Sequence, residues 1–158
     1  MDEVKRQHIA AIRALPSQLR EAVQDLDDAQ LDTPYRKDGW TIRQVVHHLA
    51  DSHMHAYLRM KFMVTEDRPT IKPYNQDIWA EQKDARSGPI QPSLVILMGL
   101  HERWASFLEN VPDVQWTRGA MHPERGEVTF ASTAATYAAH GKKHLGQIRT
   151  LREAKGWK

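Results

Sequence analysis

Four long stretches of the chain repeat apolar residues every three or four positions, and segments rich in proline, glycine and polar residues separate them. This spacing, found at residues 2–27, 42–66, 93–110 and 131–154, is typical of helices that bury one face. Pro16 falls inside the first stretch and is expected to kink or divide that helix. Since no run has the period of a strand, the pattern predicts an all-α fold in which four long helices form a bundle.

The segments between the helices carry turn and capping signals. Thr41 follows a turn-rich segment, residues 32–40, and is expected to cap the second helix with Gln44 as a capping box. The remaining connections are expected to be an extended loop at residues 68–75, a short extra helix at 76–83 and an irregular stretch or small hairpin at 118–130.

Composition narrows the class of protein. The length of 158 residues and the hydrophobic content of 41% suit one domain, residues 1–158, with a single core. The 22 basic residues are mixed with 20 acidic ones, so a nucleic-acid partner is not expected. Cysteine is absent, which excludes disulfides and thiolate ligands. The longest apolar run, residues 94–100, is too short to cross a membrane, and no signal peptide is recognisable, so a cytoplasmic location is expected.

The strongest chemical signal lies in the last predicted helix. His140 and His144 are four residues apart, so both imidazoles project from one face, where they can share a divalent metal. Lys142 and Lys143 indicate a solvent side, however, and a chain with nine histidines also places two at this spacing by chance. Gly141 stands where a zincin motif has its general-base glutamate. The pair therefore has no base of its own and needs a third ligand from elsewhere.

The second predicted helix offers that third ligand. His47 and His48 are adjacent and point about a hundred degrees apart, so only one can face the interior. His48 shares a stripe with apolar neighbours and is the better inward candidate. Asp51, one turn further on, is expected either to be a surface charge or to orient the ligand or a metal-bound water.

The other histidines of this region suggest simpler roles. His53 and His55 are expected to be surface or interface residues, because they lie far along the helix from His48. His101 is expected to be a core histidine bonded to a backbone carbonyl. Three tryptophans are more often core residues but could wall a pocket; they are Trp40, Trp79 and Trp104.

Residues 39–54, with the sequence GWTIRQVVHHLADSHM, closely resemble the second-helix signature of the DinB/YfiT-like proteins. They match the YfiT branch in particular, which is described as metal-dependent hydrolases and as bacillithiol S-transferases. Further matches follow in the same order along nearly the whole chain, at residues 31–36, 65–66, 72–74, 100–104, 122–124 and 140–148.

The resemblance implies a bundle fold, frequent homodimerisation and a single metal. In that family the metal is held by the second histidine of the paired His-His and by both histidines of the last helix. Those residues are here His48, His140 and His144. Zinc is the first expectation, with nickel or another first-row metal as alternatives.

Three imidazoles leave an open position on the metal, which is typical of catalytic sites. The ion could activate water, as in a hydrolase, or hold a small thiol as thiolate, as in an S-transferase acting on an electrophile. The residues do not separate these two activities. A non-catalytic, metal-stabilised binding module is a third alternative. The expected partner is a small-molecule substrate, with a low-molecular-weight thiol as one alternative.

Overall fold

The computed structural model describes residues 2–157, which form a bundle of four long helices. These are α1 (Glu3–Val23), α3 (Ile42–Thr65), α6 (Gln91–Asn110) and α7 (Phe130–Lys155). The all-α bundle predicted from the spacing of apolar residues is therefore confirmed. Among the helices of the described chain, none is long and apolar enough to cross a membrane.

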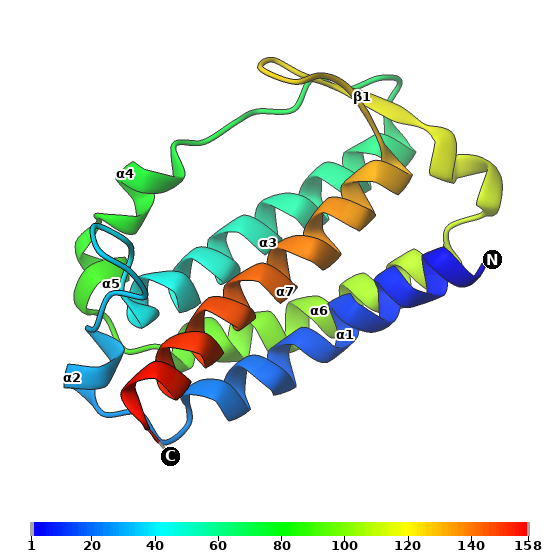
Figure 1. Ribbon diagram of the computed structural model, residues 1–158. Coiled ribbons are helices and arrows are strands. Elements are labelled where there is room, and N and C mark those ends of the chain that lie inside the picture. The colour runs from blue at the N-terminus through cyan, green and yellow to red at the C-terminus, as the bar shows by residue number, and fades with distance from the viewer. Residues whose placement is uncertain (1, 158) are drawn as a thin grey trace.

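The order of the helices around the bundle differs from their order in the chain. Both α1 and α3 pack against α6 and α7, so α1 and α3 lie at opposite corners. Helices α1 and α7 run in one direction, and α3 and α6 run in the other (Figure 1). This arrangement places the middle of α3 beside the middle of α7, which brings their histidines together.

Two apolar clusters fill the bundle, one towards each end. The first contains Leu15 and Leu19 of α1, and the second contains Ile9 and Ile12 of the same helix. On the other long helices the clusters are also separated by a few residues, and the gaps hold histidines. This middle layer holds His53, His101, His140 and His144 in the gaps. It also includes His48, whose ring contacts that of His140 although its neighbours on α3 belong to the first cluster.

The start of α3 agrees with the prediction, whereas the course and the end of α1 do not. Thr41 caps α3, because its hydroxyl accepts from the Gln44 backbone N–H at 3.1 Å while the side-chain oxygen Oε1 of Gln44 accepts from the Thr41 backbone N–H at 3.0 Å. Pro16 does not divide α1, which continues through it. The helix ends at Val23 rather than near residue 27, because Asp27 caps a separate short helix, α2 (Asp28–Leu31).

Short elements connect the long helices. The single short helix expected at residues 76–83 is in fact two, because Gln82 is extended between them. The stretch expected to be irregular or a hairpin forms two antiparallel strands. The short elements are α4 (Gln76–Ala80), α5 (Lys83–Ser87), the 3-10 helix η1 (Asp113–Thr117), β1 (Gly119–His122) and β2 (Gly126–Thr129).

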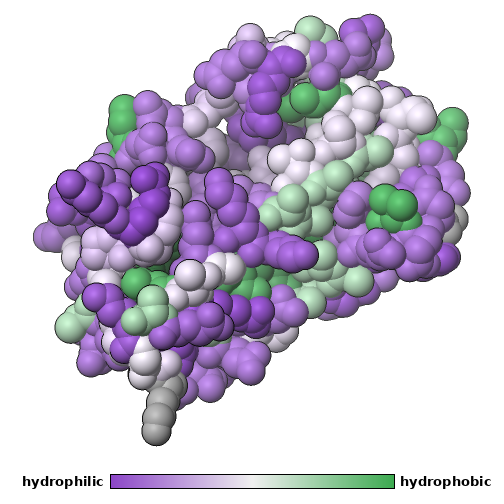
Figure 2. All heavy atoms as spheres, in the orientation of Figure 1, coloured by the Kyte–Doolittle hydropathy of each residue, from purple (hydrophilic) through white to green (hydrophobic). Residues whose placement is uncertain are grey.

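Residues 66–75 run back along the bundle from the hairpin to α4, as Figure 1 shows, and we call this segment the strap. Backbone hydrogen bonds join it to β1: Met121 donates to the Pro69 carbonyl at 3.0 Å, and Ile71 donates to the Met121 carbonyl at 2.8 Å. The strap, the hairpin and α4 thus cover α3 and α7, and Figure 2 shows the surface hollowed beneath this cover.

Candidate metal centre

The structure brings His48, His140 and His144 together in the middle layer of the bundle. His48 extends from α3, and the other two extend from α7, one turn apart. One ligand atom from each ring lies within 4.8 Å of the others. The Nε2 atom of His140 is 3.1 Å from that of His48 and 3.2 Å from that of His144. Three nitrogens therefore converge on one point.

These nitrogens suit a divalent ion. Ligand nitrogens about 2.0–2.1 Å from a tetrahedral zinc lie roughly 3.3 Å apart, close to the separations between the Nε2 atoms. The Nδ1 atom of His144 donates to the side-chain oxygen Oε1 of Gln147 at 2.8 Å, so Nε2 of this ring carries the lone pair. Nitrogens this close to one another need either a shared proton or a metal cation between them. The site therefore fits a metal that binds through imidazole nitrogen.

Burial keeps the three rings neutral. It lowers the pKa of His48 to about 2 and that of His140 to about 3, and it also lowers the pKa of His144. The neighbouring rings and the positive charge of Lys143 act in the same direction on His48. Neutral imidazole is the form that ligates a metal, so the protein holds these side chains in the state that binding needs.

The expectation that His53 lies at the surface is wrong. His53 is fully buried, and its Nε2 atom lies 3.0 Å from Nδ1 of His140. Its Nδ1 atom lies 2.8 Å from Nε2 of His101. The physical reason is that α3 packs against both α6 and α7, and His53 lies where it contacts His101 of α6 and His140 of α7. His55 is half-buried and stacks on Tyr74, with ring centroids 4.3 Å apart.

His101 is the core histidine that the sequence suggested, since its Nδ1 atom lies 2.5 Å from the carbonyl oxygen of Ile12. His47 lies outside the cluster, because its ring contacts the Ser93 hydroxyl at 2.7 Å and the Gly88 carbonyl at 3.2 Å. The adjacent histidines of α3 therefore face different neighbours, and His48 is the one that faces α7.

Asp51 is half-buried and makes no hydrogen bond within the described residues. Burial raises its pKa to about 6, and the negative charge of Asp84 adds to this effect. The hydrogen bonds that orient the clustered rings come instead from His53 and Gln147. The sequence offered no clear signal for either of these two residues.

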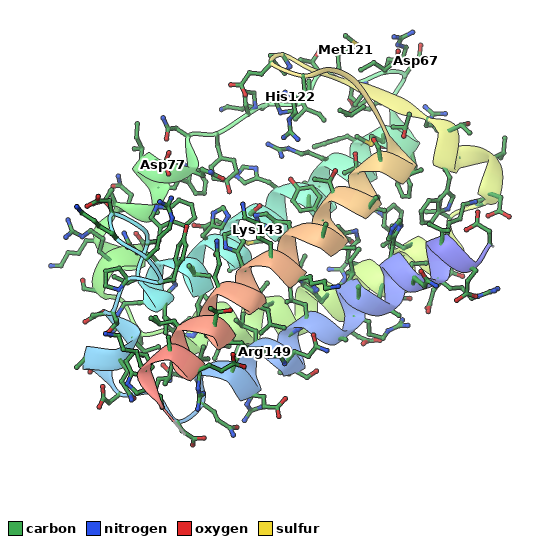
Figure 3. The ribbon with its side chains drawn as sticks, in the orientation of Figure 1. Asp67, Asp77, Met121, His122, Lys143 and Arg149 are labelled. Atoms are coloured by element: carbon green, nitrogen blue, oxygen red, sulfur yellow. The ribbon has the colours of Figure 1, made fainter. Side chains whose placement is uncertain are left out.

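Two cavities give access to the cluster. The larger, of about 600 Å³, lies under the strap and the hairpin, and the smaller, of about 320 Å³, lies beside Trp40. Both are lined by His140 and Asp77. Figure 3 shows His122 extending from the hairpin towards α3 and α7, above the larger cavity. A small molecule can therefore reach the nitrogen cluster from two sides.

Polar side chains wall the larger cavity. Arg59 donates to the Tyr137 hydroxyl and to the Lys72 carbonyl, both at 2.9 Å. Burial raises the pKa of Tyr74 to about 12, so its hydroxyl stays protonated near neutral pH. Of the three tryptophans, Trp40 lines the smaller cavity, with its ring centroid 4.6 Å from that of His48.

The fold and the three-histidine cluster define a helical-bundle protein with a candidate divalent-metal site that opens onto a cavity. The sequence matches the family model described as the DinB superfamily over residues 11–148. The chain belongs to this superfamily, as its resemblance to DinB/YfiT-like proteins suggested.

Relatives and a solved structure support this membership. A protein of Geobacillus kaustophilus named "Putative metal-dependent hydrolase" is 53% identical over 151 residues, which cover 94% of this chain and 84% of the relative. A protein of Bacillus mycoides with the same description is 46% identical, over 99% and 90% of the two chains. The structure of YfiT from Bacillus subtilis, described as a probable metal-dependent hydrolase with an unusual four-helix bundle topology, superposes with a TM-score of 0.96 at 40% identity. That match covers 100% of this chain and 91% of YfiT.

Proposed function

We propose that this chain is a metal-dependent hydrolase in which His48, His140 and His144 hold a divalent ion that activates water against a small electrophilic substrate. The observation that carries the proposal is the convergence of three neutral imidazole nitrogens beside two cavities. The descriptions of the relatives as metal-dependent hydrolases support it. Zinc is the first choice, because it takes three histidine ligands in catalytic sites.

Three protein ligands leave a position for a further molecule. A bound divalent ion supplies Lewis acidity there, lowering the pKa of water to about 7 or favouring the thiolate form of a thiol. A structural zinc site would instead be closed by four protein ligands. The set of three nitrogens therefore favours catalysis over the alternative of a metal-stabilised binding module.

The residues around the cluster define what the protein adds to the ion. Gly141, between the two ligands of α7, is buried against Leu15 of α1, so no general base stands at that position. Tyr74, whose hydroxyl stays protonated near neutral pH, lines the wall of the larger cavity. Asp51, one turn from His48 on α3, has its pKa raised to about 6, but it lines neither of the two cavities.

Elemental analysis tests the ligands. The purified protein should carry about one divalent ion per chain after loading with zinc or nickel, and His48→Ala should lose it. The matched control is His47→Ala, whose side chain lies on the other side of α3 and which should keep the ion. Loss of metal from the His47 variant but not from the His48 variant would overturn the assignment.

Activity assays then distinguish water from a small thiol as the nucleophile. A hydrolase should turn over activated esters and amides in water alone, and removing the metal should abolish turnover. An S-transferase should require a small thiol together with a halide or epoxide substrate, with a rate that rises with the thiolate fraction. Full turnover of any of these substrates by thoroughly demetallated protein would rule out both versions.

A further inference from the structure

A proline in α1 leaves one backbone carbonyl of that helix without its usual donor. In an α-helix the carbonyl of residue 12 accepts from the N–H of residue 16, but Pro16 has no N–H. Ile12 is buried, with 1% of its surface exposed, so its carbonyl needs another partner. The Nδ1 atom of His101, on α6, lies 2.5 Å from this oxygen. Because a carbonyl only accepts hydrogen bonds, Nδ1 of His101 must carry a proton.

This one proton fixes the positions of two others. A neutral imidazole has one N–H and one lone pair, so Nε2 of His101 is an acceptor. It accepts from Nδ1 of His53 at 2.8 Å, which leaves Nε2 of His53 as the next acceptor. That atom accepts from Nδ1 of His140 at 3.0 Å. The Nε2 atom of His140 is then left with its lone pair.

The lone pair points where the proposed metal would bind. Nε2 of His140 lies 3.1 Å and 3.2 Å from the Nε2 atoms of the other two clustered histidines. The reverse order of protons would put a hydrogen on this atom and block ligation. It would also leave the buried Ile12 carbonyl unpaired, which costs about 1–3 kcal/mol.

We propose that Pro16, His101 and His53 are positioning residues, which hold His140 in the tautomer with Nδ1–H and free Nε2 before any metal arrives. The metal-binding half of this inference rests on the proposed function, whereas the tautomer itself does not. Both His53 and His101 are fully buried, so water does not compete for their nitrogens. The chain of hydrogen bonds thus links the first half of α1 to the candidate metal centre through α6 and α3.

Nitrogen NMR of the metal-free protein tests the tautomer directly. In protein labelled with ¹⁵N at histidine, long-range proton–nitrogen correlations distinguish the protonated nitrogen of each ring from the unprotonated one. We expect His53, His101 and His140 all to be protonated at Nδ1. A proton on Nε2 of His140 in the wild-type protein would overturn the proposal, whether or not the protein binds metal.

Substitutions test the consequence for metal binding. His101→Phe keeps a ring but removes both nitrogens, so His53 loses its acceptor and the order of protons is no longer fixed. We expect mixed tautomers at His140 and a zinc affinity about 10- to 100-fold lower, the range for changes behind a ligand. His101→Gln retains one donor and one acceptor and should recover part of the affinity.

Trp104→Phe is the matched control for damage to the core. Trp104 is fully buried, and its ring centroid lies 5.5 Å from that of His101 and 5.7 Å from that of His53. This variant should keep the wild-type tautomers and zinc affinity. An equal loss of affinity in the Trp104 and His101 variants would contradict the proposal. If the wild-type protein binds no divalent metal while its tautomers are as expected, the proposed function fails and the tautomer assignment stands.

Discussion

Of two adjacent lysines in α7, Lys143 lies beside the candidate metal centre and Lys142 does not. Lys143 lines the smaller cavity with His140 and His144, and its positive charge lowers the pKa of both rings. Lys142 is exposed and lines neither of the two cavities that reach the cluster. In the proposed hydrolase, Lys143 would therefore stabilise negative charge that develops on a substrate in the smaller cavity.

Lys143→Gln should lower kcat/KM about tenfold, since one exposed donor contributes less than a buried oxyanion-hole donor. Zinc affinity should stay the same or rise slightly, because a like charge near the ion is removed. Lys142→Gln provides the control and should change neither quantity. Steady-state kinetics and zinc titration of both variants test this prediction. Equal losses of activity in the two variants would show that only the net charge of the surface matters.

Individual histidines show how far the sequence can be interpreted. The i, i+4 spacing predicted that His140 and His144 share a face, and their rings are in contact in the structure. The expectation for His53 rested on its distance along the helix from His48, which suggested a surface or interface position. It failed because neighbours cover more than one face of α3, and the sequence of α3 alone does not reveal them.

At the scale of elements, α1 and α7 approach each other closely at Gly141. A Cβ atom added there would lie 2.6 Å from Cδ2 of Leu15. Gly146, one and a half turns further along α7, is exposed and has nothing within 4 Å of the corresponding point. The two glycines of one helix thus stand in opposite environments, and only the first is required by packing.

Gly141→Ala should lower the free energy of unfolding by about 1–2 kcal/mol, because overpacking against Leu15 outweighs the gain in helix propensity. Gly146→Ala should raise it by up to about 1 kcal/mol, since propensity acts there alone. Urea unfolding monitored by circular dichroism measures both. Equal stabilisation of the two variants would contradict the prediction. It would mean that the Leu15 side chain can change its conformation at little cost when a methyl group is added at residue 141.

Elements were predicted where their signals are local. The capping box of Thr41 and Gln44 predicted the start of α3 from two residues. The prediction failed where a signal competes with packing. Pro16 was expected to interrupt α1, but the helix is buried against α6 and α7, and His101 satisfies the carbonyl that the proline leaves free.

The molecule as a whole contains a polar layer between two apolar clusters, and this layer makes its stability sensitive to acid. Burial lowers the pKa of His48 to about 2, that of His140 to about 3 and that of His101 to about 4. In the unfolded chain each has a pKa of about 6.5. Between these values the unfolded chain binds protons that the folded protein does not, so acid favours unfolding.

The metal-free protein should therefore lose stability as the pH falls from about 7 to about 5. Each of these histidines contributes a slope of up to about 1.4 kcal/mol per pH unit in this range. Above pH 7 the contribution should be constant, because the rings are neutral in both states. Urea unfolding at pH 5, 6 and 7.5 measures how steeply the free energy of unfolding depends on pH. His48→Gln should reduce this slope by the contribution of one histidine, up to about 1.4 kcal/mol per pH unit. A free energy of unfolding that does not change between pH 7.5 and 5 would contradict the burial of neutral histidines.

Pro16 also matters to anyone who redesigns this scaffold for heat resistance. Judged by helix propensity, a proline inside a 21-residue helix is the first residue to replace, and alanine there would restore a backbone donor. The restored donor would compete with His101 for the Ile12 carbonyl. Selection of variants for thermal stability alone would then favour bundles in which the tautomer of His140 is less strictly held. Variants selected in this way therefore need a second screen for zinc binding.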